Sequence, residues 1–152
     1  QFAFDKDDIG GSNDYLPHNY NNNCVVYTGT HDNEAIHGWF MGLGKEEKAF
    51  VRDYMGDHET ANKWMYKQLI AMAMRSAARD CIIPAQDWLG LDNSSRMNAP
   101  GTVGVNWSWR LTPGQITDEL ADEILTITKR FGRANWDALN RLEKAKKQSK
   151  TV

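Results

Sequence analysis

Residues 24–33 read CVVYTGTHDN, a short apolar run that ends abruptly in a cluster of polar side chains. Val25, Val26 and Tyr27 favour a strand, because β-branched and aromatic side chains suit a pleated surface and the run is too short for a helix. Near-continuous apolarity is typical of a parallel strand that is buried on both faces. Since ligands of α/β folds bind past the carboxyl ends of such strands, the polar residues after Thr28 are the first candidates for a functional site.

A second apolar run repeats this pattern over residues 81–85, CIIPA, and two polar residues follow it at once. Pro84 lacks a backbone donor, so it marks the end of this second strand. The sequence between the two runs is helical in pattern and long enough for a right-handed crossover between parallel strands. The polar side chains after both strands are therefore expected at one edge of a parallel sheet. These side chains are His31, Asp32, Gln86 and Asp87.

Helical periodicity dominates the rest of the chain, so the sequence predicts a helix-rich α/β fold. Asn33 and Thr60 are predicted to cap helices, because their side chains can accept hydrogen bonds from a first helical turn. A further strand is predicted at residues 2–4. The helices are expected over residues 33–41, 45–54, 60–79, 117–130 and 134–147. Long loops are expected over residues 7–23, with one helical turn, and over residues 88–113.

The composition is that of an ordinary globular protein: 152 residues, 41% hydrophobic, 25% charged, with a net charge of -2. A nucleic-acid surface would show a basic excess, and no apolar stretch has the length of a membrane span, so we expect neither nucleic-acid nor membrane partners. Cys24 and Cys81 lie in apolar runs, which indicates reduced thiols and a cytoplasmic location; a disulfide is the alternative if the two strands are neighbours. The chain begins at Gln1 within strand-like sequence, and we expect it to be a piece of a longer protein.

Asp32 is the carboxylate best placed for chemistry, because Asp is depleted in strands and this one directly follows a strand, beside His31. It can accept hydrogen bonds from a polyol or stabilise a developing positive charge, while His31 can bind a sugar hydroxyl. The structural alternatives are a helix N-cap for Asp32 and a satisfied structural histidine. A metal site is not predicted, since His31 and His37 do not share a helical face and no Cys joins them. No nucleophile-elbow motif indicates a Ser or Cys triad.

Two tryptophans, Trp107 and Trp109, lie in the long loop, where aromatic rings either stack on sugar rings or pack onto the domain. Arg96, Asn98 and Arg110 add polar groups to the same loop. These groups suit a hydroxyl-rich ligand, while an ion pair that holds the loop down would explain the arginines equally well.

Several segments, in order over nearly the whole chain, resemble one family of carbohydrate-active enzymes. They are LPHNY at residues 16–20, VVYTGTHDN at 25–33, PAQD at 84–87 with LGL at 89–91, RMN at 96–98 with PGT at 100–102, and NW at 106–107 with WR at 109–110. Together they are similar to the 4-alpha-glucanotransferases, which are the amylomaltases or disproportionating enzymes of glycoside hydrolase family 77. Two positions depart from the usual pattern: Val105 stands where Gly precedes the Asn-Trp pair, and Glu34-Ala35 stands where Asp-Thr is common.

The resemblance implies the carboxyl-terminal part of a (β/α)8 barrel, about its last three strands with their helices, as a single incomplete domain over residues 1–152. It implies an enzyme of starch, glycogen and maltose metabolism that transfers α-1,4-glucan segments with retention of configuration. The family uses an Asp nucleophile, a Glu acid/base and a third Asp that grips hydroxyl groups of the distorted sugar. Asp32 matches the third carboxylate, as a transition-state stabiliser, and no segment matches the other two. The implied substrate contacts are His31, Asn33, Asn98 and Trp107.

These implications extend to partners and activity. The parent protein is expected to act on α-1,4-glucans and maltooligosaccharides, with no cofactor and no metal, while the chain alone is expected to be inactive. An incomplete barrel leaves an edge strand unpaired, so self-association of the chain is expected. The alternative is a non-catalytic glucan-binding module that keeps Asp32 and the tryptophan loop, and a third interpretation is a structural subdomain that completes a barrel.

Overall fold

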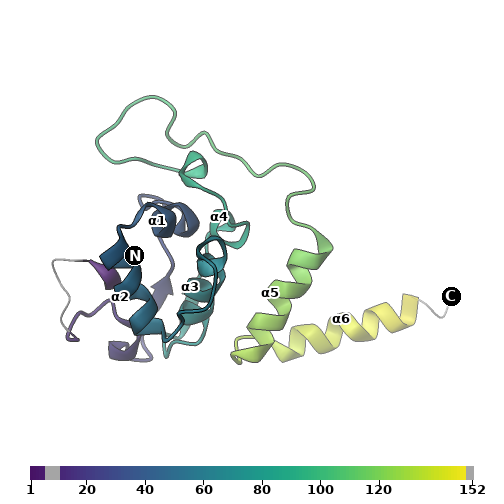
Figure 1. Cartoon of the computed structure of the whole chain (residues 1–152). Helices are drawn as coiled ribbons and strands as arrows, with labels where there is room; N and C mark the ends of the chain where they lie inside the picture. The colour runs from purple at the N-terminus through teal and green to yellow at the C-terminus, as the bar shows by residue number, and fades with distance from the viewer. Residues whose placement is uncertain (6–10, 150–152) are drawn as a thin grey trace. The chain divides into compact units, whose positions relative to one another are not determined.

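The computed structural model describes residues 1–5 and 11–149 (Figure 1). Contacts within the chain separate it into two compact units, residues 1–115 and residues 116–152. The expectation of a single incomplete domain stays a prediction.

The first unit contains a two-stranded parallel sheet of β1 (Val25–Tyr27) and β2 (Asp80–Ile82). Val26 pairs with Cys81 in the register of this sheet. The predicted parallel pair is therefore confirmed, and β2 ends before Pro84, as the missing backbone donor of proline requires. Helical sequence connects the two strands, in agreement with the predicted crossover.

Burial of the sheet differs from the prediction, because the described elements cover only one of its faces. Val26 is buried against Ala73 and Ala78, whereas Val25 and Tyr27 on the opposite face are 41% and 46% exposed. The expectation of a strand buried on both faces is thus wrong for this chain. Continuous apolarity in a sequence does not say what covers each face, and here the covering elements lie on the Val26 side.

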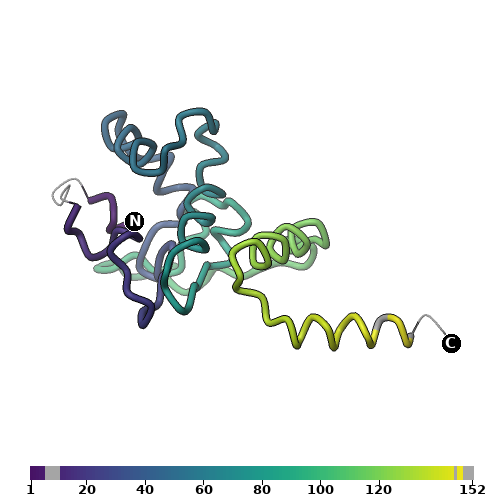
Figure 2. Tube along the Cα trace, turned by 90° about the horizontal axis from the view of Figure 1, so that it is seen from below, coloured from purple at the N-terminus to yellow at the C-terminus, as the bar shows by residue number. Residues whose placement is uncertain are grey.

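Helices make up most of the regular secondary structure of the first unit (Figures 1 and 2). The α-helices are α1 (Ile36–Gly42), α2 (Lys45–Met55), α3 (Met65–Met74) and α4 (Ala85–Trp88). The short 3-10 turns are η1 (Phe2–Phe4), η2 (Pro17–Asn19), η3 (Asn62–Trp64) and η4 (Asn93–Ser95). Helix α3 packs against both α1 and α4, and the core forms where their apolar faces meet. The apolar side chains with essentially no exposure are Ile36, Phe40, Val51, Met65 and Ile70.

The strand predicted at residues 2–4 is wrong, because this segment forms the 3-10 turn η1. The ring of Phe4 lies 5.9 Å from Phe50 and 5.5 Å from Tyr54 in edge-on geometry, and 6.1 Å from Trp39. An aromatic cluster formed with distant residues therefore determines the backbone here, in preference to local strand propensity.

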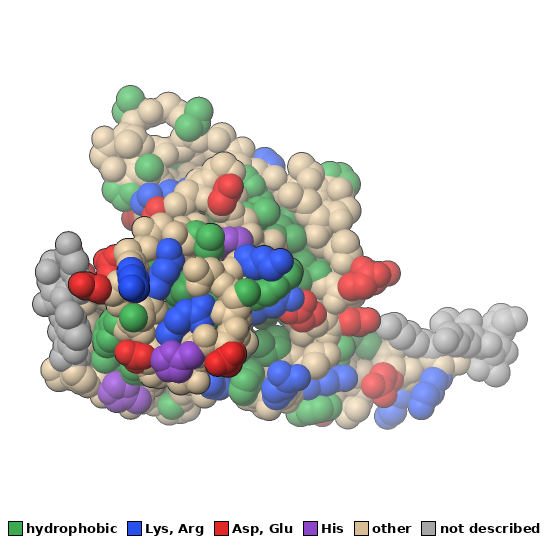
Figure 3. Space-filling model, viewed as in Figure 1, with side chains coloured by type: hydrophobic (Ala, Val, Ile, Leu, Met, Phe, Trp, Pro, Cys, Tyr) green, Lys and Arg blue, Asp and Glu red, His purple; other side chains and the backbone are tan. Residues whose placement is uncertain are grey.

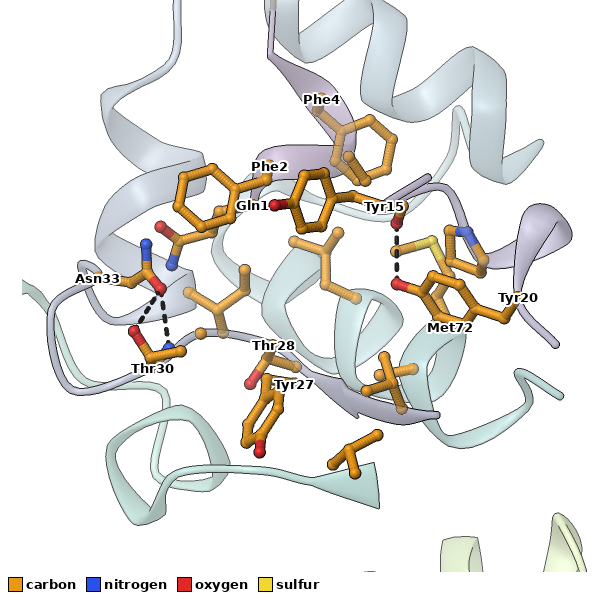
Figure 4. A pocket seen from close by; sticks show the side chains of 18 of the residues that line it. Gln1, Phe2, Phe4, Tyr15, Tyr20, Tyr27, Thr28, Thr30, Asn33 and Met72 are labelled. Carbon is orange, nitrogen blue, oxygen red and sulfur yellow. Dashed lines mark hydrogen bonds between the residues drawn. The ribbon is translucent and has the colours of Figure 1, made fainter. Parts of the chain in front are cut away.

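The two predicted N-caps, Asn33 and Thr60, are also wrong. Helix α1 begins at Ile36 with Ala35 at its N-cap position, and α3 begins at Met65 after the turn η3. The side chain of Asn33 accepts hydrogen bonds from Thr30 instead, at 2.8 Å from its backbone N–H and 2.9 Å from its hydroxyl (Figure 4). An Asn side chain can accept hydrogen bonds either within a turn or at a helix N-cap, and Asn33 does so within the turn.

The unpredicted helix α4 ends at Trp88, where the long loop predicted over residues 88–113 begins. This loop contains the turn η4, and the described chain then holds no helix or strand before α5 (Asp118–Arg130). Asn106 secures this loop: its Oδ1 accepts from the Ala99 backbone N–H at 3.0 Å, and its Nδ2 donates to the Thr102 carbonyl at 3.1 Å. Figure 3 shows that hydrophobic side chains remain among the charged ones on the surface of the chain.

The second unit consists of α5 and α6 (Trp136–Ser149). The side chain of Thr117 accepts from the Leu120 backbone N–H at 3.2 Å and caps α5, so the predicted helix boundary is confirmed. Gly132 follows α5 with a φ of 69°, which a glycine adopts without strain. None of the helices in the described part of the chain is long and apolar enough to span a membrane.

Candidate functional site

A pocket of about 680 Å³ lies where the carboxyl ends of β1 and β2 meet. Its lining includes the polar residues that follow both strands, so the prediction that they share one edge of the sheet is confirmed. The members of that predicted set are His31, Asp32, Gln86 and Asp87. A second pocket, of about 390 Å³ and more apolar, runs along β1 and includes Phe2, Tyr15 and Tyr27 (Figure 4).

The turn between β1 and α1 presents His31 and Asp32 at the rim of the larger pocket. Its geometry is fixed by the hydrogen bonds from Thr30 to Asn33, which close the turn around these two residues. The side chains of His31 and Asp32 are 55% and 47% exposed. They are therefore accessible to a ligand, and Asn33 contributes by shaping the turn.

Asp32 is held by a partner from a distant loop. Its Oδ1 accepts a hydrogen bond from Nδ2 of Asn98 at 2.6 Å and lies 3.3 Å from Nε2 of His31. Within the described residues, the other carboxylate oxygen has no hydrogen-bond partner. The N-cap alternative is wrong, since α1 begins at Ile36 and the backbone N–H of Ile36 donates to Asp87. The carboxylate of Asp32 is thus oriented and still available to a ligand.

Arg96 fixes the Asn98 loop onto the turn that carries Asp32. Its Nη2 donates to the backbone carbonyl of Asp32 at 2.5 Å, and its Nε donates to that of Asn98 at 2.9 Å. The Asn98 backbone N–H donates in turn to the carbonyl of His31 at 3.1 Å. Arg96 therefore does hold the loop down, as the structural alternative for the arginines expects, but it does so through backbone carbonyl groups.

Trp107 lies against His31, which is one of the residues that line the pocket. Its ring centroid lies 5.0 Å from that of His31, and the residue is 51% exposed. Its φ of 63° makes it the one non-glycine residue with a positive φ in the described ranges. The N–H of Trp107 donates to the Met97 carbonyl at 2.6 Å, while Arg110 donates to the Trp107 carbonyl at 2.7 Å. Backbone strain of this kind persists where the surroundings enforce it, and it is concentrated at functional sites.

Gln86 and Asp87 line the pocket but are buried, at 8% and 2% exposure. Asp87 accepts from the hydroxyl of Thr28 and, at 2.8 Å, from the backbone N–H of Ile36. Burial raises the pKa of the Asp87 carboxyl above its ordinary value, against the opposing effect of these two hydrogen bonds. The polar pair directly after the strand predicts that both residues lie at this edge of the sheet. It does not predict that their side chains are buried.

His37, considered with His31 as a metal ligand, lies elsewhere. Its ring stacks on Tyr66 with centroids 5.5 Å apart, and its Nδ1 is 2.8 Å from the carbonyl oxygen of Gly90. No group of three or more His, Cys, Asp or Glu side chains that could hold a metal ion occurs in the described part of the chain. Cys24 and Cys81 are not joined in a disulfide.

Fold and site together define an α/β protein in which a carboxylate and a histidine line a pocket at the carboxyl ends of parallel strands, with an amide bonded to the carboxylate and an exposed aromatic ring beside the histidine. Comparison with known proteins assigns it more narrowly. The family model of the 4-alpha-glucanotransferases matches residues 1–117, and the chain belongs to this family.

Individual relatives agree with this assignment. The chain is 44% identical over 135 residues to a 4-alpha-glucanotransferase of Clostridium butyricum, a match that covers 88% of this chain and 26% of that protein. It is 45% identical over 136 residues to the chloroplastic/amyloplastic 4-alpha-glucanotransferase of Solanum tuberosum, covering 88% of this chain and 23% of the relative. The structure of an amylomaltase from Streptococcus agalactiae in complex with acarbose matches with a TM-score of 0.79 at 35% identity, over 88% of this chain and 27% of that one. The chain thus spans about a quarter of the length of these relatives.

Proposed function

We propose that this chain is the carboxyl-terminal part of a (β/α)8 barrel, about its last three strands with their helices, and that the complete protein transfers α-1,4-glucan segments between maltooligosaccharides with retention of configuration. Family membership and the parallel β1–β2 pair with its helical crossover support this proposal. The observation that carries it is the Asp32 carboxylate, bound on one oxygen by Asn98 and exposed beside His31, whose ring lies next to that of Trp107. Such a site suits a ligand rich in hydroxyl groups.

Asp32 acts in this proposal as the carboxylate that stabilises the transition state. Retaining glycosyl transfer passes through transition states with oxocarbenium character, in which the sugar ring flattens and its anomeric centre gains positive charge. A fixed carboxylate binds ring hydroxyl groups more strongly as this charge develops, because its charge and orientation are already in place. The hydrogen bond from Asn98 and the backbone clamp of Arg96 supply that fixed orientation.

The substrate contacts proposed around Asp32 are made by neighbouring side chains. The exposed ring of Trp107 offers an apolar face for a sugar ring, and His31, which packs beside it, offers ring nitrogens to a hydroxyl group. Asn98 contributes through the orientation of Asp32, and Asn33 through the turn that presents it. The amylomaltase relative is complexed with acarbose, and the α-1,4-glucans and maltooligosaccharides proposed as ligands here agree with such a site.

The nucleophile and the acid/base of this reaction are proposed to lie in parts of the complete protein beyond this chain. The chain alone is then inactive, and it self-associates through the uncovered face of its sheet. A reducing compartment, proposed as the cytoplasm, suits the absence of a disulfide between Cys24 and Cys81. The Solanum tuberosum relative, in contrast, is named chloroplastic/amyloplastic.

A disproportionation assay with maltotriose tests the proposal, using the complete protein and this chain side by side. The expected result is glucose and longer maltooligosaccharides from the complete protein, and none above background from the chain alone. Disproportionation by the pure chain would refute the assignment of the other two carboxylates. Glucan binding by the complete protein without any transfer would instead support the non-catalytic glucan-binding module.

A further inference from the structure

Buried polar side chains of the first unit gather beside the candidate site. The buried polar residues of the described chain are Asn13, Thr28, Gln86, Asp87 and Ser95. All except Asn13 lie around the start of α4, directly after β2, where Thr28 bonds to Asp87 and Gln86 bonds to Ser95. Burying polar groups is costly unless each is bonded, so such a concentration in a small core calls for a reason beyond packing.

Asp87 joins the two ends of the turn that carries Asp32. One of its oxygens accepts from the hydroxyl of Thr28, at the end of β1, and the other accepts at 2.8 Å from the backbone N–H of Ile36, at the start of α1. The turn between these two anchors holds both His31 and Asp32. Asp87 therefore determines where the Asp32 turn leaves the strand and where it enters the helix.

Gln86, the preceding residue, binds the loop that carries Arg96 and Asn98. Its Nε2 donates to the backbone carbonyl of Ser95 at 3.2 Å. Ser95 directly precedes Arg96, whose guanidinium group binds the carbonyls of Asp32 and Asn98. Two consecutive side chains thus anchor the two loops that meet at the Asp32–Asn98 hydrogen bond.

We propose that Gln86 and Asp87 are positioning residues that align Asp32 with Asn98 for the transfer reaction, an inference that rests on the proposed function. Asp87 acts from inside the protein, since it is 2% exposed and both of its oxygens are bonded. Taking a carboxylate out of water carries a desolvation cost that hydrogen bonds offset only in part, so stability does not explain its presence. These buried side chains therefore serve the geometry of the site.

Thr28 offers the cleanest variants for a test in the complete protein. Thr28→Val keeps the shape of the side chain and removes the donor to Asp87, while Thr28→Ser restores the donor. We expect Thr28→Val to lower kcat on the order of tenfold with KM changed less than about threefold, because small misplacements of a reacting group are costly. Thr28→Ser is expected to recover most of kcat. Val51→Ala, a core change in α2, serves as the control that lowers Tm without lowering kcat.

A double-mutant cycle separates positioning from stability. If Thr28 and Asp87 act through Asp32, Thr28→Val costs less than about twofold in kcat once Asp32 is already replaced by Asn. The same roughly tenfold loss in both backgrounds, or a lowered Tm with unchanged kcat, would overturn the inference and leave the proposed function standing. Normal turnover of Asp32→Asn alone would overturn the proposed role of Asp32 and this inference with it.

The hydrogen bond from Gln86 to Ser95 is tested in the same way with Gln86→Leu, which keeps the approximate side-chain volume and removes the donor. We expect the same pattern: lower kcat, little change in KM, and little further loss in the Asp32→Asn background. An effect on KM alone would show that the Gln86 side chain does not act through Asp32, and would restrict the inference to Asp87.

Discussion

Nδ2 of Asn98 donates a hydrogen bond to Oδ1 of Asp32 at 2.6 Å, across 66 residues of sequence. This bond joins the turn after β1 to the long loop after α4, alongside the bonds from Arg96 to the Asp32 carbonyl and from the Asn98 N–H to the His31 carbonyl. Because Asp32 is half exposed, its orientation depends on this donor more than on burial. The consequences can be measured in the complete protein.

Asn98→Asp places a second carboxylate against that of Asp32. Like charges at this distance disfavour ionisation, so the pKa of the pair rises. We expect a larger loss of kcat than in Asn98→Ala, together with a shift of the acidic limb of the pH–rate profile to higher pH. Asn98→Ala itself is expected to lower kcat about tenfold or more, through loss of a hydrogen bond to a charged group.

The control for the charge that Asn98→Asp introduces is Asn21→Asp, at an exposed position outside the site. This variant is expected to keep the kcat and the pH–rate profile of the parent protein. Equal losses in Asn98→Asp and Asn98→Ala, with unshifted pH profiles, would contradict this account of Asn98.

Trp107→Ala removes the aromatic face beside His31 and is expected to raise KM for maltooligosaccharides on the order of tenfold, which corresponds to about 1.4 kcal/mol of lost binding. Trp107→Phe retains an aromatic face and is expected to lie much nearer the parent value. Trp136→Ala provides a matched control, since Trp136 is similarly exposed and lies in α6. An unchanged KM in Trp107→Ala would show that this ring packs against the protein without serving the ligand.

The burial of Asp87 predicts that its contribution to stability decreases as pH rises. Because burial raises its pKa above the ordinary value of 3.8, the folded chain binds the proton more tightly than the unfolded chain does. The contribution of Asp87 to the free energy of unfolding is therefore full below about pH 4 and falls as pH rises through the raised pKa. The Tm of the parent protein minus that of Asp87→Asn is expected to decrease with rising pH over this window. An increase would mean that the hydrogen bonds from Thr28 and Ile36 outweigh burial.

Self-association of the isolated chain is expected through the uncovered face of its sheet. Val25, Tyr27 and Ile82 are 41%, 46% and 50% exposed in this two-stranded sheet of the described chain. Light scattering at micromolar concentration is expected to give a mass above that of one chain, and Ile82→Lys to reduce it. Val103→Lys, at a fully exposed loop position, is the control. A strictly monomeric parent chain would contradict the expectation.

Local sequence signals predicted those parts of the fold that depend on neighbouring residues. The β-branched run at Val25 and Val26 forms a strand, and the helix predicted over residues 117–130 forms as α5. The turn at Phe2–Phe4 could not be predicted in this way, since the ring of Phe4 packs against residues far along the chain. Asn33 had two local roles open to it, and the bonds from Thr30 decide between them.

In the site, too, local sequence predicts some features, while others depend on contacts between residues that are distant in the sequence. Strand order and strand ends placed His31, Asp32 and Asp87 at one edge, because parallel strands bring their carboxyl ends together. The burial of Asp87 could not be predicted, because it depends on Thr28 and Ile36 meeting it in the folded chain. Nor does any spacing in the sequence indicate that Asn98 binds Asp32.

Steady-state kinetics of Asp32→Asn in the complete protein, with a melting curve on the same sample, test most directly whether the Asp32 carboxylate stabilises the transition state. Asn keeps the size of Asp and most of its hydrogen-bonding capacity but removes the charge, so a group that acts in the transition state loses most of its effect. We expect kcat to fall by several orders of magnitude, with KM and Tm changed far less. Near-normal turnover would contradict the proposed role, and would make Asp32 a residue that shapes the turn after β1 without taking part in the transfer.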